Sequence, residues 1–204
     1  MHIKTGKTTI SVTFPFAATV VLMLLLCDEE IVIISVFSSL FHECGHLFFM
    51  AVFSSLPRLI EFGAFGIRIE KNENRLISYK KESLVAIGGI IGNVILSSVG
   101  MFFYLIEKSE WSLRLFAVNV FIALFNLITV RQLDAGRCLE CIFSAFFDEE
   151  KGEHWLDIIS AVSVLFVVVC CVIYNIFVSF NISFIAVTVY LILISTFKEL
   201  KNDK

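Results

Sequence analysis

Residues 31–54 read IVIISVFSSLFHECGHLFFMAVFS, an apolar run that carries the polar string HECGH in its middle. A helix of this length is long enough to cross the ~30 Å hydrocarbon core of a bilayer. Ionisable residues are costly at membrane depth and are usually found there in functional sites. The stretch therefore predicts a membrane-spanning helix that carries a functional site.

The spacing of the polar residues indicates a metal site. His42 and His46 are four residues apart, so on a helix they lie on one face and can bind one zinc ion. Glu43, beside the first histidine, is placed to act as a general base toward a zinc-bound water. The structural alternatives are a hydrogen-bonded histidine pair in a helix bundle and an ion pair between Glu43 and an arginine.

The composition predicts an integral membrane protein. The chain is 58% hydrophobic and 17% charged, with a mean hydropathy of +0.89, well outside the range of soluble domains. A net charge of −3 offers no basic surface for nucleic acid. We expect the six cysteines to be reduced core residues, with a metal or redox role for Cys138 and Cys141 as a minor alternative.

The apolar segments predict an all-α, multi-pass protein with about six transmembrane helices. A chain of 204 residues then leaves no room for a soluble domain, so residues 1–204 form one integral-membrane domain. A cytosolic N-terminus places 14 of the 16 basic residues on the cytosolic side, as the positive-inside rule requires, and both termini are then cytosolic. The expected spans are 9–27, 31–54, 83–106, 113–130, 156–178 and 182–197.

A different pattern follows the second expected span. Residues 62–66 are glycine-rich, residues 67–70 alternate, residues 71–74 resemble a turn, and residues 75–79 resemble a strand. This predicts a small membrane-associated β-hairpin over 62–79, whose edge could take up an extended substrate as an added strand. An exposed cytosolic loop is the alternative.

A catalytic zinc needs a third protein ligand, with the fourth position left for water. Asp134 follows the fourth apolar segment and is followed by a small residue and Gly136, which allow the helix to break and the carboxylate to turn inward. Its structural alternative is an interfacial turn residue paired with Arg131 or Arg137. Glu140 is a second candidate for the third ligand.

Three motifs together resemble the site-2 intramembrane metalloproteases. That family's pattern is an HExxH in one core span, a glycine-x-x-x-asparagine in the next, and an asparagine followed eight positions later by an LDG-type aspartate. The corresponding residues here are 42–46, Gly89 with Asn93, and Asn126 with Asp134. The resemblance covers about residues 31–140 and is nearest to the compact sporulation-associated branch, which processes a sigma-factor precursor.

The resemblance implies an intramembrane zinc metalloprotease. One zinc ion is expected on His42, His46 and Asp134, with Glu43 as the base. Asn93 and Asn126 are expected to contact the substrate backbone or the developing oxyanion, with interhelical hydrogen bonding as the alternative.

The resemblance also implies a setting. The expected substrates are membrane-embedded or membrane-associated proteins in a bacterial cell membrane, cleaved in regulated intramembrane proteolysis with a possible regulatory membrane partner. The catalytic core would span about 31–140, and the helices at 9–27, 156–178 and 182–197 would serve as scaffold or gate. A non-catalytic membrane scaffold or transporter component that keeps the fold is the alternative.

The chain departs from the family pattern before the aspartate. Residues 129–132 stand where the family usually has prolines, Ala135 replaces a glycine, and Ile90 stands where proline is common. No ligand or base is lost, but the backbone path around Asp134 is affected, because proline fixes φ and lacks an N–H donor.

Overall fold

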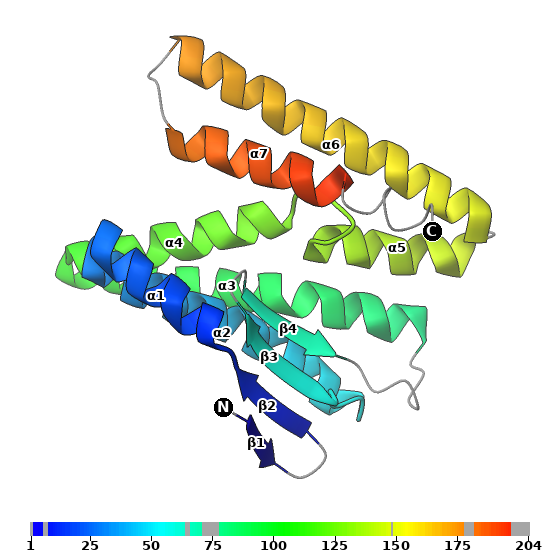
Figure 1. Ribbon diagram of the computed structural model, residues 1–204, viewed down its shortest axis with the longest axis horizontal. Coiled ribbons are helices and arrows are strands. Elements are labelled where there is room, and N and C mark those ends of the chain that lie inside the picture. The colour runs from blue at the N-terminus through cyan, green and yellow to red at the C-terminus, as the bar shows by residue number, and fades with distance from the viewer. Residues whose placement is uncertain are drawn as a thin grey trace. The chain divides into compact units, whose positions relative to one another are not determined.

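The computed structural model describes residues 2–5, 8–63, 66–70, 78–147, 149–177 and 182–196. These residues form seven helices and four strands (Figure 1). They divide into two compact units, Met1–Phe125 and Asn126–Lys204.

The first unit contains four helices and a sheet. Its helices are α1 (Phe14–Leu26), α2 (Glu29–Val52), α3 (Tyr79–Glu107) and α4 (Glu110–Asn126, whose last residue belongs to the second unit). Asp28 caps α2, because its carboxylate accepts hydrogen bonds from the backbone N–H groups of Glu30 and Ile31 at 3.0 and 3.4 Å.

Helices α2 and α3 lie along each other in close contact. Gly45 and Gly88 face each other there, and a Cβ on either one would collide with the backbone of the other. Beyond this contact, Ile34, Leu96 and Leu115 form a buried apolar cluster that joins α2, α3 and α4. This packing fixes the face of α2 that carries the two histidines.

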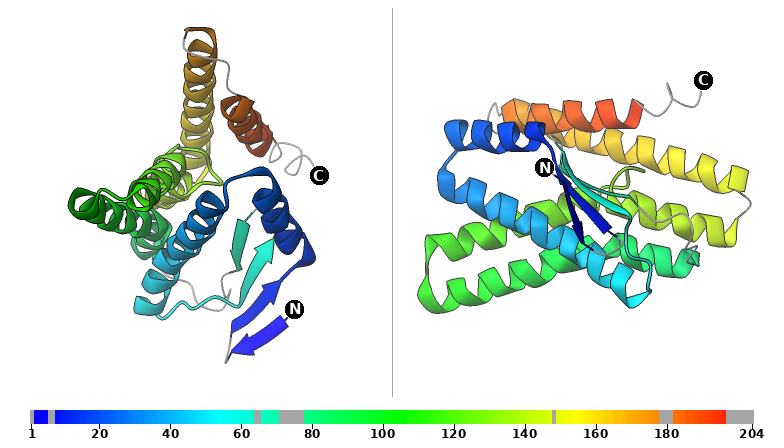
Figure 2. Two further views of the ribbon diagram at one scale, coloured as in Figure 1. Left: turned by 90° about the vertical axis from the view of Figure 1, so that its left-hand side faces the viewer. Right: turned by 60° about the horizontal axis from the view of Figure 1, so that its bottom comes forward.

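The sheet has four strands in the order β1, β2, β3, β4 (Figure 2). Strands β1 (His2–Thr5) and β2 (Thr8–Val12) are antiparallel, as are β3 (Leu59–Gly63) and β4 (Gly66–Glu70). The central pair β2 and β3 is parallel, because α1 and α2 carry the chain away from the sheet and back again between these strands.

The predicted hairpin after the second span is confirmed, but it comes earlier than expected. Its strands are β3 and β4, joined at the pair formed by Gly63 and Gly66. Residues 71–77, predicted as a turn and the start of a strand, lie outside the described residues. Tyr79 begins α3 rather than ending a strand, so the boundaries 62–79 were wrong.

The prediction of one helix over 9–27 was also wrong. Residues Thr8–Val12 form β2, and the helix over Phe14–Leu26 has only 13 residues. Between them, the Thr13 hydroxyl donates a hydrogen bond to the Phe62 carbonyl at 2.8 Å. Threonine and branched apolar residues fit a strand well, and only the partner β3, about fifty residues later, decides that they form one.

Three described helices are long and apolar enough to cross a membrane: Glu29–Val52, Tyr79–Glu107 and Lys151–Phe177. The chain is thus a mainly helical membrane protein with a small sheet. Helices α1, α4 and α7 have 13, 17 and 15 residues, so the expected number of six spans stays a prediction.

The second unit consists of α5 (Asp134–Phe146), α6 (Glu149–Phe177) and α7 (Ile182–Thr196). Helix α6 packs against both α5 and α7 (Figure 1). Helix α5 was not predicted, because it is short and amphipathic. The helix expected at 156–178 begins at Glu149, two turns before its predicted start.

Candidate metal centre

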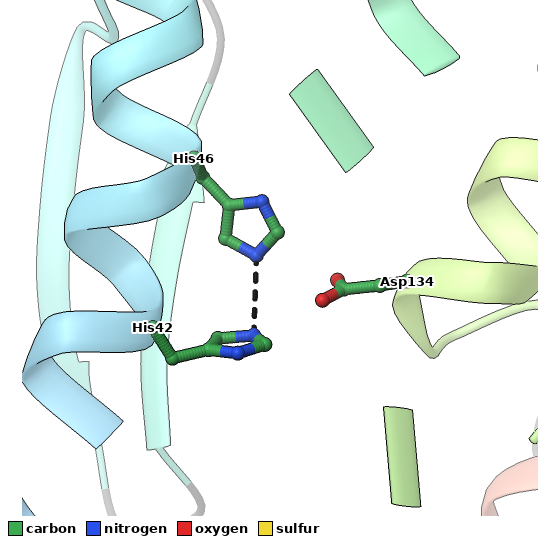
Figure 3. A group of neighbouring side chains, drawn as sticks. All are labelled: His42, His46 and Asp134. Carbon is green, nitrogen blue, oxygen red and sulfur yellow. Dashed lines mark hydrogen bonds between the residues drawn. The ribbon is translucent and has the colours of Figure 1, made fainter. Parts of the chain in front are cut away.

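The histidines belong to the first unit and Asp134 to the second, so each is described with the helix that carries it. His42 and His46 are buried on one face of α2. Their Nε2 atoms are 3.2 Å apart, and the two rings are nearly perpendicular, at 87° (Figure 3). The helical spacing of four residues therefore brings two imidazole nitrogens to one point.

The other nitrogen of each ring has a hydrogen-bond acceptor. His42 Nδ1 contacts Asn93 Oδ1, and His46 Nδ1 lies 2.8 Å from the Val85 carbonyl oxygen. Because both partner atoms are acceptors, each Nδ1 is placed to donate its proton, and each ring in its neutral form presents an Nε2 lone pair. This is the tautomer that binds a metal through Nε2, and outer partners of this kind orient ligand imidazoles.

These surroundings fit a zinc ion. Two lone pairs that face each other at 3.2 Å repel unless a cation or proton lies beside them. Two Zn–N bonds of about 2.0–2.1 Å in tetrahedral geometry place their nitrogens about 3.3 Å apart. Gly89 also leaves room for an ion beside the two Nε2 atoms, because a Cβ at this position would lie 2.5 Å from Nε2 of both histidines.

A hydrogen-bonded chain of buried polar groups continues from His42. Asn93 Nδ2 donates to Asn119 Oδ1 at 2.8 Å, and Asn119 Nδ2 donates to Ser38 Oγ at 2.8 Å. Asn93, Asn119 and Ser38 are completely buried. Side chains from α2, α3 and α4 thus hold the first candidate ligand without using any charged group.

Sequence reasoning did not identify Ser38 or Asn119. A signal was present, because Ser38 lies one helical turn before His42, and Asn119 lies two turns before Asn126 in an otherwise apolar segment. Polar residues that recur on one face of a transmembrane helix indicate contacts between helices.

The observed contacts of Asn93 are those of the interhelical alternative. Its Oδ1 contacts His42, and its Nδ2 donates to Asn119 and, at 3.4 Å, to the Ser38 carbonyl. Its expected role toward a substrate oxyanion stays a prediction. The same holds for Asn126, the half-buried last residue of α4.

Glu43 is half-buried on α2, next to His42. Successive residues on a helix are about 100° apart around its axis, so Glu43 projects beside the histidine face. Cys44 is exposed. The role of Glu43 as a base stays a prediction.

In the second unit, Asp134 is a buried residue at the first position of α5 (Figure 3). A carboxylate is favoured there by the exposed N–H groups and the dipole at the start of a helix. A turn precedes it, in which the N–H of Leu133 donates to the Val130 carbonyl at 2.8 Å. Gly136 lies against this turn, where a Cβ would collide with the backbone of Val130.

One of the two arginines that the sequence offered as partners for Asp134 has other partners. Arg131 makes ion pairs with Glu140, Glu153 and Asp157. Glu140, the other candidate ligand, therefore has a cation beside it already. These contacts favour Asp134 over Glu140 as the third ligand.

All six cysteines are free, and Cys27, Cys44 and Cys170 are exposed. The expectation that the cysteines lie in the core was therefore wrong for these three. Cys138 is buried, and this burial raises the pKa of its thiol.

A comparison with solved structures gives this fold a known counterpart. The chain superposes on a site-2 protease from Methanocaldococcus jannaschii with a TM-score of 0.62 and 17% sequence identity, over 96% of this chain and 93% of the other. The chain has the fold of a site-2 protease. No protein-family model matches the sequence, and no curated protein matches it either.

Proposed function

We propose that the chain is an intramembrane zinc metalloprotease, which hydrolyses peptide bonds in membrane-embedded or membrane-associated proteins. The observation that carries the proposal is the histidine pair, whose Nε2 lone pairs converge while both Nδ1 atoms contact acceptors. The pair lies in a chain that has a site-2 protease fold and three helices long enough to span a membrane.

His42, His46 and Asp134 would hold one zinc ion, with two nitrogen donors and one oxygen donor. All three are buried and of residue types that bind zinc, and the set leaves a fourth position open, as catalytic zinc sites do. A zinc ion bound there would supply a water with a pKa lowered to about 7 and would polarise the substrate carbonyl.

The remaining steps belong to residues of the chain. Glu43 would take the proton of the attacking water and deliver it to the leaving amine. Asn126 would donate a hydrogen bond to the substrate backbone or the oxyanion. Asn93 was expected to do the same, and its contacts support a role through His42 instead.

The proposal extends to the setting in which the chain acts. Strand β4 is an outer strand of the sheet formed by the described residues, and an extended substrate could add to it as a further strand. A regulatory membrane partner, a place in the bacterial cell membrane with cytosolic termini, and kinship with the sporulation-associated branch are all parts of the proposal that rest on the sequence.

The proposal is tested by replacing the base while keeping the ligands. Glu43→Gln should retain zinc in the purified protein and lower cleavage of a co-expressed membrane-tethered reporter by at least ~100-fold. Glu107→Gln, at the exposed end of α3, is the matched control and should cleave normally. Cleavage by Glu43→Gln at the control rate would reject Glu43 as the base.

The same reporter and a zinc assay test the third ligand. Asp134→Ala should deplete zinc, whereas Glu140→Gln should retain most of it. The reverse result would assign the ligand to Glu140. A chain that binds no zinc and cleaves no reporter would support the scaffold alternative.

A further inference from the structure

The turn that leads into Asp134 contains buried residues and internal backbone hydrogen bonds. Val130 and Leu133 are buried, and the Val130 N–H donates to the Ile128 carbonyl at 2.8 Å. The chain has two prolines, Pro15 and Pro57, so no proline fixes φ in this turn. The path of the backbone into Asp134 is held instead by backbone hydrogen bonds and by side-chain contacts.

Arg131 provides those contacts from the middle of the turn. Its Nε donates to Glu140 Oε1 on α5 at 3.0 Å, and its Nη2 donates to Glu153 Oε1 on α6 at 2.9 Å. Its Nη1 lies 3.5 Å from Asp157 Oδ1, also on α6. One planar guanidinium thus joins the turn to both neighbouring helices, which a lysine ammonium could not do with the same geometry.

The charges make this arrangement depend on the arginine. Burial disfavours the charged form of Arg131, whose side chain is only 10% exposed. The attraction and hydrogen bond of Glu140, followed by the attraction of Glu153 and Asp157, outweigh that effect and raise the pKa of Arg131. Loss of the guanidinium would remove three ion pairs at once, which is more costly than the loss of one surface ion pair.

We propose that Arg131 is a positioning residue, which clamps the turn before Asp134 to α5 and α6 and so sets where the Asp134 carboxylate points. The effect on zinc rests on the proposed function. The effect on the turn itself does not, and it can be measured separately.

The first experiment follows zinc release from the purified full-length protein to a chelator, at low and high salt. Arg131→Gln should release zinc on the order of tenfold faster than the natural chain, as expected when a partner that orients a ligand is lost. The carboxylates are 42%, 59% and 65% exposed, so salt should weaken the clamp and speed release in the natural chain. Arg131→Gln should lose that salt dependence, which a simple packing defect would not do.

The matched control is Arg137→Gln, which removes an exposed arginine one turn into α5. Its zinc release should stay within about twofold of the natural rate, as for most surface substitutions. Equal effects of the Arg131 and Arg137 variants would overturn the proposal. If Arg131→Gln does not fold, Arg131→Lys replaces it and should release zinc faster than the natural chain, but by less than about tenfold.

A double-mutant cycle tests whether Arg131 acts through its partner. The variant that carries both Arg131→Gln and Glu140→Gln should release zinc faster than the natural chain. Its fold-increase in rate should be smaller than the product of the two single fold-increases, because both substitutions remove the same contact. Strictly multiplicative effects would show that Arg131 does not act through Glu140 and would overturn the clamp.

Backbone hydrogen exchange of residues 130–136 separates this inference from the proposed function. Arg131→Gln should speed exchange there and Arg137→Gln should not, whether or not zinc is bound. If Glu43→Gln cleaves normally, the protease proposal fails while the exchange result still decides the clamp. Unchanged exchange in Arg131→Gln rejects the clamp and leaves the protease proposal standing.

Discussion

The two halves of the candidate metal centre are supported by different kinds of interaction. On the histidine side, His42 is held by neutral hydrogen bonds through Asn93, Asn119 and Ser38, all completely buried. On the aspartate side, the turn before Asp134 is held by the ion pairs of Arg131, whose partners are partly exposed.

The difference follows from where each half lies along the membrane helices. The histidines lie within α2, a candidate membrane span, where a charged partner would have to be desolvated and neutral amides are less costly. Arg131 lies between α4 and α5, outside the candidate spans, where water can reach its partners. We therefore expect salt to affect the aspartate half and not the histidine half.

The largest expected effect comes from filling the space beside the histidines. Gly89→Ala would place a Cβ 2.5 Å from Nε2 of both His42 and His46, so zinc affinity should fall by at least ~100-fold. Gly92→Ala is the control on the same helix, because its nearest neighbour would be the Phe41 carbonyl oxygen at 3.2 Å, and it should keep most of the zinc. Zinc titration of both purified variants measures the difference.

Gly136→Ala is the counterpart in the aspartate half. Its Cβ would collide with the Val130 backbone, so it should disturb the turn and speed hydrogen exchange at residues 130–136. Gly89→Ala should leave exchange in that turn unchanged. If Gly89→Ala binds zinc normally, the space beside the imidazoles is not a metal site, and His42 and His46 are not the ligands.

A smaller effect is expected at the far end of the neutral hydrogen-bonded chain. Asn119→Leu removes the acceptor of Asn93 Nδ2 and the donor to Ser38 Oγ, and unsatisfied buried groups of this kind cost about 1–3 kcal/mol each. Zinc affinity should fall by about tenfold, and by the same factor at low and high salt. A zinc titration at two salt concentrations measures this.

Asn175→Leu is the control for Asn119→Leu. Asn175 lies in α6, and its Nδ2 donates to the Cys171 carbonyl at 2.9 Å within the same helix. Its replacement should leave zinc affinity unchanged. A salt-dependent loss of zinc in Asn119→Leu would contradict the distinction between the neutral half and the charged half.

The sequence predicted those parts of this arrangement that depend on local spacing. A separation of four residues was enough to place His42 and His46 on one face. The small residues after Asp134, among them Gly136, were enough to predict a helix break there and to single out Asp134 as a candidate ligand. The pairs formed by Asn119 with Ser38 and by Arg131 with Glu153 join residues 81 and 22 positions apart, and only packing brings them together.

The fold shows the same limit. Residues 9–27 have the apolar content of a span, and hydrophobicity does not separate a buried strand from a helix over a short run. The strand Thr8–Val12 forms because β3 pairs with it. Helix α5 was missed because an amphipathic segment of 13 residues carries no transmembrane signal.

The smallest expected effect is at the ion pairs of the histidine half. Arg114 on α4 lies 3.1 Å from Asp28 and 3.0 Å from Glu30 at the start of α2, but its side chain is 31% exposed, against 10% for Arg131. Exposed pairs contribute about 0.2–1 kcal/mol, so Arg114→Gln should lower the thermal stability of the detergent-purified protein only slightly. Zinc release should not change, because Arg114 supports neither imidazole. If Arg114→Gln released zinc as fast as Arg131→Gln, the loss of any ion pair would speed zinc release. Arg131 would then not be a positioning residue for Asp134.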